Sequence, residues 1–497
     1  MLKNVQNLTN NIMFACGGCK KNRKKGVPRK PVDTKYIGKN CVIAGYSVRA
    51  INQSAKACNM STLTVDCFAD MDLRRVADAF VHVNLDRYKD DNGKLEKPAA
   101  AYIEEELMKH EEMLDKADFI LVGSGFENHP KYLQSIAKND AYTGNGLSSI
   151  EKVRKVDSIL PFLKKHDILF PNTVTFHLSK SSPENLHIDN LFVNSKTNPR
   201  DLKAMENGAK TSEFIFNNYL VDLLEAPFVL KSAKTGGGFS MYKINTVDEF
   251  REATIKISDV KKGPLVAQEY IHGDAMSCSF ISTGSKAKPI AYTKQIIGEK
   301  RFGCKNDFAY CGNIMNPEIS DVNHDDNKEL TDSIQRIIDL IVEDSKLVGS
   351  NGLDFVLRNG KQEHPEIYFL EINTRFQGTL DLIEAVTGQN VVEMHIESIR
   401  SKTLPDDLKF PDQDTYLKAI YYSPLDFYIM VDLNNLEYND APLIGNFLQE
   451  GEPICSSIVQ GVNEEEAFEK GLDDRDLITR VQSLESRIDE DSAFLRR

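Results

Sequence analysis

The residues best suited to chemistry lie on two neighbouring segments, 351–358 (NGLDFVLR) and 366–379 (EIYFLEINTRFQGT). Both segments are rich in aliphatic and aromatic residues, and a short polar turn joins them, so they predict a β-hairpin. Asp354 and Glu371 can then face one another, and Asn373 lies on the same side of its strand as Glu371. Two carboxylates and an amide oxygen form a hard-oxygen site suited to Mg²⁺, which takes its remaining ligands from water and phosphates.

The sequence neighbours of these acids are apolar, namely Phe355, Val356, Phe369, Leu370 and Ile372. This context predicts that the carboxylates are buried, and buried carboxylates need a cation. Mg²⁺ together with a nucleotide would meet that need. The simpler alternative is a surface strand whose acids form salt bridges.

A glycine-rich loop forms the second candidate, in residues 226–244 (APFVLKSAKTGGGFSMYKI). The pattern predicts two antiparallel strands joined by a loop that contains Gly236, Gly237 and Gly238. Bare N–H groups in such a loop let the backbone approach a phosphate, and Lys231 adds a positive charge. No helix with Gly-Lys-Ser/Thr follows, so this is not a Walker loop. A flexible hairpin is the alternative.

Between these two candidates lies the segment 266–274 (VAQEYIHGD), which reads as a strand followed by a tight turn. Such a hinge can read an adenine edge through its backbone groups. Glu269 could accept a hydrogen bond from the adenine amino group, and Asp274 could hold ribose hydroxyls. Each residue alone is weak evidence, whereas their order along the chain is a stronger signal.

That order is a glycine-loop hairpin with a strand lysine, a Glu-containing hinge, then Asp on one strand and Glu-x-Asn-x-Arg on the next. It resembles the ATP-grasp superfamily, whose members include D-alanine–D-alanine ligase and biotin carboxylase. The resemblance covers roughly residues 40 to 480. Residues 441–468 are similar to the terminal lobe of the biotin-carboxylase-like branch. GYSVRAINQSA followed by VDCFADMDL resembles the predicted ATP-dependent carboligases of that branch.

The resemblance implies an α/β fold of the α+β ATP-grasp type and a set of roles for the residues above. Glu371, Asn373 and Asp354 would bind Mg²⁺, with Mn²⁺ as a substitute. Lys231 would hold the α/β-phosphates of ATP, and glycines 236 to 238 would cover the β/γ-phosphates.

The remaining implied roles concern the base, the ribose and the transferred group. Glu269 and the backbone of Ile271 would read adenine, and Asp274 would contact the ribose, although it follows Glu269 at a shorter spacing than in better-known ligases. Arg154, or its neighbour Lys155, would touch phosphate. Arg375 would point at the acyl phosphate, because a guanidinium stabilises charge on a transferring phosphoryl group or an oxyanion.

The implied activity is an ATP-dependent, ADP-forming ligase that joins a small carboxylate to an amine, and cofactor biosynthesis is the implied setting. The carboxylate attacks the γ-phosphate, and the amine attacks the resulting acyl phosphate while the closed loop excludes water. A carboxylase that uses carboxyphosphate is one alternative. It is disfavoured because FQGTLD has no glutamate where biotin carboxylases place one. A nucleotide-binding regulator without turnover is the other alternative.

The acceptor site has weaker sequence signals. Ser47, Arg49 and Gln53 follow the first predicted strand, where open α/β sheets bind ligands. Arg49 could grip a substrate carboxylate or simply face solvent from a helix. The polar and aromatic insert 299–313 could shape the acceptor pocket, with Arg301 as its candidate catalytic residue and Cys311 as a further candidate.

These residues require elements that position them, and the chain divides accordingly into four parts. Residues 1–39 predict a basic flexible leader, 40–145 a small parallel α/β domain, 146–400 the ATP-grasp domain with its glycine-loop lobe at about 215–275, and 401–497 a C-terminal lobe with a charged helical tail. Within them, residues 146–171 predict one helix, capped by Ser148 or Ser149 and broken or kinked at Pro161.

Composition narrows the function classes further. The 497 residues carry a net charge of -13, which argues against nucleic-acid partners, and no apolar run is long enough to predict a membrane partner or span. Nine scattered cysteines and the lack of a secretory signal predict a cytoplasmic protein with free thiols. Cys16 and Cys19 could form a zinc site with Cys304 and Cys311, but free thiols are the simpler interpretation. A homodimer is possible.

Overall fold

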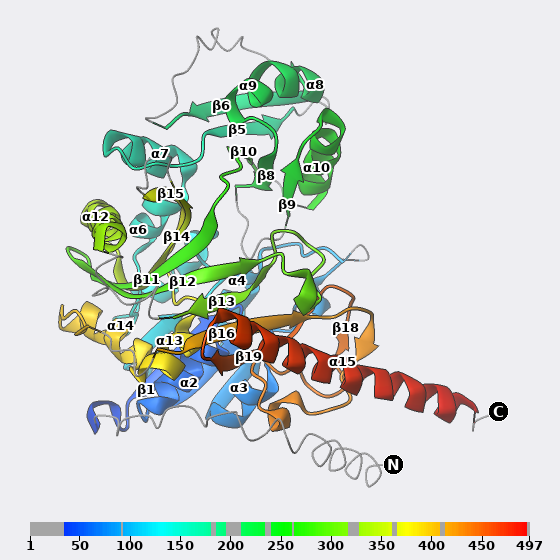
Figure 1. Cartoon of the computed structure of the whole chain (residues 1–497). Coiled ribbons are helices and arrows are strands. Elements are labelled where there is room, and N and C mark those ends of the chain that lie inside the picture. Colours follow the sequence, from blue (N-terminus) through cyan, green and yellow to red (C-terminus); the bar gives the residue numbers. More distant parts are fainter. Residues whose placement is uncertain are drawn as a thin grey trace.

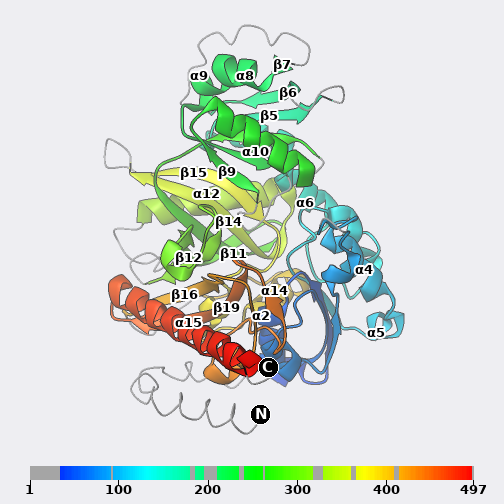
Figure 2. The same cartoon turned by 90° about the vertical axis from the view of Figure 1, so that its right-hand side faces the viewer.

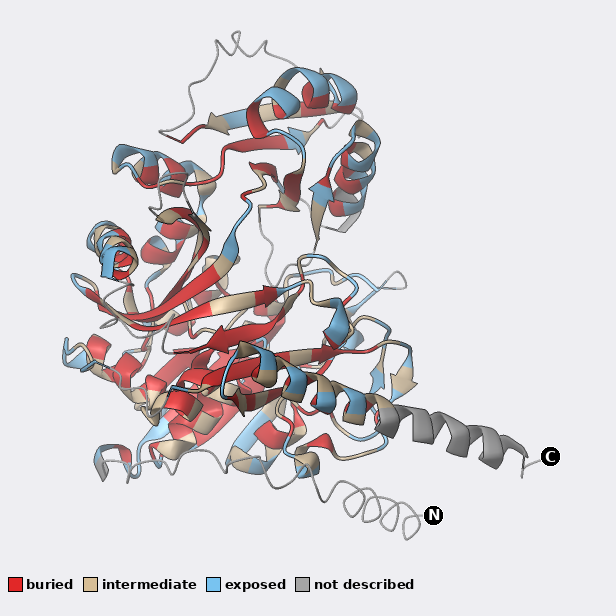
Figure 3. Cartoon of the chain, in the orientation of Figure 1, coloured by how far each residue is buried: buried red, intermediate tan, exposed pale blue. Residues whose placement is uncertain are grey.

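The computed structural model describes residues 34–90, 93–179, 185–194, 210–233, 240–260, 263–316, 328–359, 365–407 and 413–494. These ranges build three larger sheets and one two-stranded sheet. The helices cover the outer faces of the sheets, and the buried residues gather along the central strands (Figures 1 and 3). The mixed α/β architecture predicted from the sequence is confirmed.

The first sheet is wholly parallel and has the strand order β3-β2-β1-β4. Its strands are β1 (Asn40–Gly45), β2 (Ser61–Asp66), β3 (Ala79–His82) and β4 (Phe119–Val122). Its helices are α2 (Arg49–Ala57), α3 (Met71–Val76), α4 (Ala99–Met108) and α5 (Glu111–Asp115). The strand order reverses between β1 and β4, and such a switch point is where open α/β sheets bind ligands. Figure 2 shows this unit (blue) beside α14 and β19.

Two short helices, α6 (Leu147–Arg154) and α7 (Val156–Lys165), follow where the sequence predicted one. The interruption lies at Lys155, which has an extended backbone, and not at Pro161, which α7 tolerates. The N-cap of α6 is Gly146, so the predicted serine caps are also wrong. This break makes Arg154 the last residue of α6.

The second sheet has six antiparallel strands in the order β7-β6-β5-β10-β8-β9 and forms the upper lobe in Figure 1. The strands are β5 (Thr173–Leu178), β6 (Asn185–Phe192), β7 (Lys210–Thr211), β8 (Phe228–Ser232), β9 (Met241–Ile244) and β10 (Leu265–Glu269). The helices are α8 (Ser212–Ile215), α9 (Val221–Leu224) and α10 (Val247–Val260). They share a core with the sheet that includes Phe176, Phe216, Phe228 and Phe250. The predicted hairpin of β8 and β9 is present, whereas Gly236, Gly237 and Gly238 lie outside the described residues.

The third sheet has seven antiparallel strands in the order β15-β14-β11-β12-β13-β16-β19. They are β11 (Asp274–Thr283), β12 (Ala287–Ile297), β13 (Tyr310–Met315), β14 (Val348–Asn359), β15 (Pro365–Asn373), β16 (Thr415–Tyr422) and β19 (Pro453–Gly461). The helices α12 (Lys328–Ser345), α13 (Leu380–Thr387), α14 (Val391–Arg400) and α15 (Glu464–Phe494) accompany this sheet. β17 (Phe427–Tyr428) pairs separately with β18 (Phe447–Leu448). The C-terminal part of the chain therefore completes the sheet that carries β14 and β15.

Membrane crossing finds no support in the described residues. None of the helices there is both long and apolar enough to span a bilayer.

Candidate functional site

The predicted hairpin of β14 and β15 brings the predicted metal ligands together. Asp354 pairs directly with Glu371, and Gly352 pairs with Asn373. Asn373 Nδ2 donates a hydrogen bond to Asp354 Oδ2 at 2.7 Å, and Gln295 Nε2 from β12 donates to Asp354 Oδ1 at 3.1 Å. We call Asp354, Glu371 and Asn373 the acid–amide trio.

The two acids of the trio differ in their electrostatic surroundings. Burial raises the pKa of Asp354 to about 6, and the charge of Glu371 acts in the same direction. Burial also acts to raise the pKa of Glu371, but the charges of Arg154 and Lys231 outweigh it, so this pKa is lowered. Glu371 therefore stays anionic, and Asp354 is the acid that a further cation would stabilise.

Two cations, Arg154 and Lys231, border the trio. Arg154 Nη1 donates to Glu371 Oε2 at 2.9 Å and to the backbone oxygen of Ile372 at 3.2 Å. Burial lowers the pKa of the Lys231 ammonium on β8, and Glu371 opposes that effect. Lys231 thus faces the same carboxylate from the upper lobe.

Arg375 lies beyond the trio, and an acid that the sequence reasoning missed holds it. Arg375 Nε donates to Glu127 Oε1 at 3.1 Å, and Arg375 Nη1 donates to the backbone oxygen of Phe376 at 3.0 Å. Glu127 is buried, and its Oε2 accepts from Gly125 N at 2.7 Å. The adjacent Asn128 accepts from Arg154 Nη2 at 2.6 Å. The sequence did hold a signal for these two residues, because Glu127 and Asn128 follow β4 at the carboxyl edge of a parallel sheet.

The predicted adenine-reading residues lie where β10 leaves the upper lobe. Glu269 ends β10, its Oε2 accepts from Asn172 N at 3.1 Å, and burial raises its pKa. Ile271 is buried against Val356 and Tyr368. Asp274 begins β11 as an exposed residue, with Oδ1 3.7 Å from Lys294 Nζ.

Arg301 lies apart from the trio. Its side chain is 60% exposed, bonds Glu299 and stacks on Phe468 with 4.5 Å from its Cζ to the ring centre. Cys304 and Cys311 are buried in the core beneath β16 and β19. Cys16 and Cys19 lie outside the described residues. Arg301 therefore stays only a candidate for the acceptor region.

Arg49 matches neither of its sequence interpretations, because it is 1% exposed and fully engaged by acids. Its Nη2 donates to Asp381 at 2.7 Å, and its Nε lies 2.8 Å from Asp440 and 3.4 Å from Asp72. Gln53 accepts from Arg49 Nη1 at 3.2 Å. A substrate carboxylate would have to displace one of these aspartates.

The trio offers a partial shell for a divalent cation. Asn373 donates through its side-chain nitrogen, and its side-chain oxygen Oδ1 has no hydrogen bond among the described residues. No group of three or more His, Cys, Asp and Glu side chains in that part of the chain is arranged to hold a metal ion. The trio has only two acids and one amide oxygen, so it would hold Mg²⁺ only together with phosphate and water oxygens as the other ligands.

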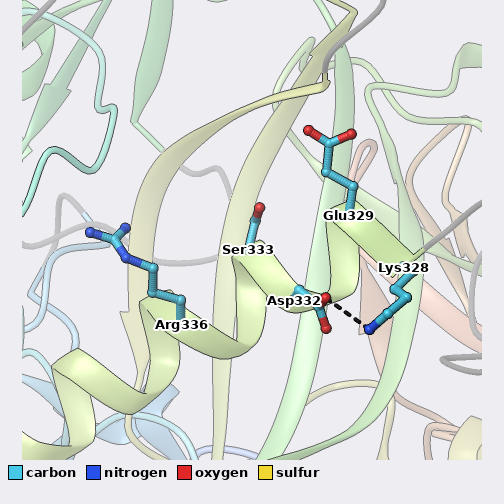
Figure 4. Close-up of a pocket in the computed structure, with 5 residues that line it drawn as sticks. All are labelled: Lys328, Glu329, Asp332, Ser333 and Arg336. Carbon is cyan, nitrogen blue, oxygen red and sulfur yellow. Dashed lines mark hydrogen bonds and ion pairs between the residues drawn. The ribbon is translucent and has the colours of Figure 1, made fainter.

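The surface hollow in Figure 4 does not belong to this site. It lies against the first turns of α12 and is lined by Lys328, Glu329, Asp332, Ser333 and Arg336. Most of these side chains are exposed, and Lys328 already pairs with Asp332 at 3.0 Å.

Comparison with known proteins agrees with this geometry. Residues 202–379 match the family model of the ATP-grasp domain. An uncharacterised protein of Methanocaldococcus jannaschii is 26% identical over 254 residues, which are 49% of this chain and 56% of that relative. The match thus spans little more than half of the relative's length.

Three solved structures share the fold. Biotin carboxylase from Campylobacter jejuni gives a TM-score of 0.59 at 14% identity, over 87% of this chain and 89% of that one. N5-carboxyaminoimidazole synthetase from Staphylococcus aureus, complexed with ADP, gives 0.58 at 14% identity, over 88% and 98%. An L-amino acid ligase from Bacillus licheniformis gives 0.56 at 14% identity, over 88% and 98%. Residues 202–379 therefore match an ATP-grasp domain, and the chain shares the fold of these three solved structures.

Proposed function

We propose that this protein is an ATP- and Mg²⁺-dependent ligase that activates a small carboxylate as an acyl phosphate for attack by an amine. The observation that carries the proposal is the acid–amide trio, bordered by Arg154 from α6, Lys231 from β8 and Arg375 just beyond β15. The solved relatives include an L-amino acid ligase and an N5-carboxyaminoimidazole synthetase bound to ADP, which supports ATP-dependent ligation as the reaction class.

The charges around the trio suit phosphoryl transfer. Mg²⁺ held by Asp354, Glu371 and Asn373 would supply Lewis-acid stabilisation of the phosphate oxygens. Lys231 and Arg154 would neutralise phosphate charge on the side of the upper lobe. Arg375 would stabilise the charge that develops first on the transferred phosphoryl group and then on the tetrahedral oxyanion.

The chemistry then follows in two balanced steps. A substrate carboxylate oxygen forms a bond to the γ-phosphorus, the bond to the bridging oxygen breaks, and ADP leaves. The amine lone pair next attacks the acyl carbon, the bond to the phosphate oxygen breaks, and phosphate leaves while the amine loses a proton. Asp354 and Arg375 are half-buried, and exclusion of the remaining water when the substrates bind would protect the acyl phosphate from hydrolysis.

A turnover screen tests the proposal. The full chain is incubated with Mg-ATP and pairs drawn from carboxylic acids, amino acids, amines, thiols and bicarbonate, and ADP release is measured. We expect ADP release to require an acid and a product amide to require an amine. Release driven by bicarbonate alone would favour carboxyphosphate chemistry, and tight ATP binding without any release would favour a regulator.

Glu127 offers a separate test of the site, because it holds Arg375 without belonging to the trio. Glu127→Gln keeps the shape of the side chain but removes the negative charge that accepts the hydrogen bond from Arg375. Arg375 is then less firmly oriented. We expect kcat to fall by about 10-fold while KM for ATP changes little. Steady-state kinetics measures both values, with the exposed Glu112→Gln on α5 as control. Equal kinetics in both variants would count against this positioning role.

A further inference from the structure

Five aspartates and two cations meet where β1 and β2 end, and we call them the acidic cluster. Its members are Asp66, Asp70, Asp72, Asp381, Asp440, Arg49 and Lys418. Asp66 ends β2, Asp70 and Asp72 lie at the start of α3, Asp381 lies on α13, and Asp440 lies in the loop before β18. Arg49 begins α2, and Lys418 lies on β16. The parallel sheet, the seven-stranded sheet that carries β14 and β15, and the C-terminal part of the chain all contribute side chains to this cluster.

Most carboxylates of the acidic cluster have partners. Asp381 lies 2.7 Å from both Arg49 and Lys418. Asp440 accepts from Arg49 at 2.8 and 3.0 Å and from Ser456 at 2.5 Å.

The other two partnered acids rely on the backbone. Asp72 accepts from the N–H groups of Asp440 and Ala441, at 3.1 and 3.2 Å. Asp66 accepts from backbone N–H groups at 2.6 to 2.7 Å, those of Val48, Phe68 and Ala69. Both cations of the cluster are used by these contacts.

Asp70 is the exception. It is 6% exposed, and its carboxylate has no hydrogen bond or ion pair with any residue that the structure describes. It occupies the N-cap position of α3 yet makes no capping bond, although aspartate is among the best capping residues. The charged groups that act on it are Asp440, Asp66, Asp72 and Arg49, so it lies among like charges. Arg49 already bonds Asp381 and Asp440, so a further cation would stabilise the charged form of this nine-tenths-buried carboxylate.

The cluster is open to solvent at one side. The Asp440 side chain is 34% exposed, and the exposed rings of Tyr46 and Phe68 follow β1 and β2 with their centres 5.1 Å apart. Aromatic faces attract organic cations.

The cluster also lies next to the proposed catalytic site. Lys418 Nζ bonds Asp381 and the backbone oxygen of Gly378, three residues beyond Arg375. A side chain at Gly378 would lie 3.3 Å from the Tyr310 hydroxyl. Burial raises the pKa of Tyr310, and both Asp381 and Asp354 add to that effect. Tyr310 therefore lies within electrostatic reach of both the acidic cluster and the acid–amide trio.

We propose that Asp70 and Asp440 bind the ammonium group of the acceptor substrate, so that the ligase takes a cationic primary amine. This assignment rests on the proposed function. It names the acceptor class and places its binding group at the ends of β1 and β2, near the acid–amide trio.

Binding of a defined amine tests the assignment without turnover. Saturation-transfer NMR on the full chain compares n-butylamine with its neutral counterpart n-butanol. We expect wild type to bind the amine and not the alcohol, and Asp70→Asn to weaken amine binding by about 10-fold, as expected for one lost charge-assisted hydrogen bond. Asp115→Asn, an exposed acid in the same α/β unit, should bind like wild type. Equal binding by Asp70→Asn, preference for the alcohol, or no amine binding by wild type would overturn the assignment.

Thermal unfolding separates a ligand-binding acid from a structural one. Burial raises the pKa of Asp70 well above its usual range, and Asp440, Asp66 and Asp72 add to this while Arg49 opposes it. At this group the folded state then binds more protons than the unfolded state, so the contribution of Asp70 to stability falls as pH rises above about 4. Asp70→Asn should raise Tm at pH 8, with a smaller gain near pH 4. A lower Tm in Asp70→Asn would reveal a structural partner and overturn the assignment.

Hydroxylamine keeps the two proposals distinguishable. As a neutral nucleophile it converts an acyl phosphate to a hydroxamate without needing an ammonium site. Hydroxamate formed by the wild-type protein with a suitable acid, together with weak butylamine binding by Asp70→Asn, supports both proposals. Lack of hydroxamate with every acid would count against the ligase reaction, while the butylamine result would still decide the role of Asp70.

Discussion

Glu371→Gln should lower the kcat of ATP turnover by about 10²- to 10³-fold, because the metal ion and its ligands supply several kcal/mol of stabilisation to the charge of the transition state. The substitution keeps the size of the side chain but removes the charge that pairs with Arg154 at 2.9 Å and faces Lys231. Two positive groups would then lack their shared anion, and the metal would lose one ligand. ADP release across a Mg²⁺ titration measures the effect.

The matched control is Glu343→Gln, an exposed acid on α12 in the same part of the chain. It should turn over ATP like wild type. A Glu371→Gln enzyme that keeps full turnover and an unchanged Mg²⁺ requirement would show that Glu371 is no metal ligand. Restoration of turnover by high Mg²⁺ would instead place the loss in metal affinity.

The acid–amide trio could be predicted from the sequence because its geometry is local. Alternating strand residues and a short turn predict which residues face each other across a hairpin, and the register does pair Asp354 with Glu371. The parallel order of the first sheet followed in the same way from strand, turn and helix patterns. Both depend on residues close together in the chain.

The partners of the trio could not be predicted, because they are distant in the chain. Arg154 and Glu371 are 217 positions apart, and Glu127 and Arg375 are 248 apart. A local pattern shows that a charged residue follows a strand, but not which side chain meets it after folding. The assignment of Arg154 came from the family resemblance, and Glu127 was missed because its segment showed only a strand that ends in small residues.

The partners of Arg49 could not be predicted for the same reason, and here the free energy of unfolding depends on them. Its place after β1 is compatible with a solvent-facing helix residue or a substrate-binding one. The outcome is set by Asp381 and Asp440, which lie 332 and 391 positions away. Burial acts to lower the pKa of Arg49, but the aspartates outweigh this, so the guanidinium stays charged in the interior.

Arg49→Met should therefore destabilise the protein strongly, by about 3–5 kcal/mol, because it leaves buried aspartates without their shared cation. The decrease in the urea concentration at the midpoint of unfolding measures this destabilisation. Arg75→Met is the matched control, since Arg75 also pairs with an aspartate, Asp432, but its side chain is 41% exposed. Exposed pairs contribute about 0–1 kcal/mol, so this control should unfold close to wild type.

The pH dependence identifies the cause of that loss. Burial acts to raise the pKa of Asp440 and of Asp381, but the charges of Arg49 and Lys418 outweigh it, and both values are lowered in the folded protein. A carboxyl whose folded pKa is depressed contributes stability that is present above its unfolded pKa near 4 and lost as pH falls below it. The deficit of Arg49→Met relative to wild type should therefore be largest near pH 7 and shrink toward pH 3. A deficit that is independent of pH would assign the loss to packing of the arginine stem, and a deficit no larger than that of Arg75→Met would show that the aspartates are compensated without Arg49.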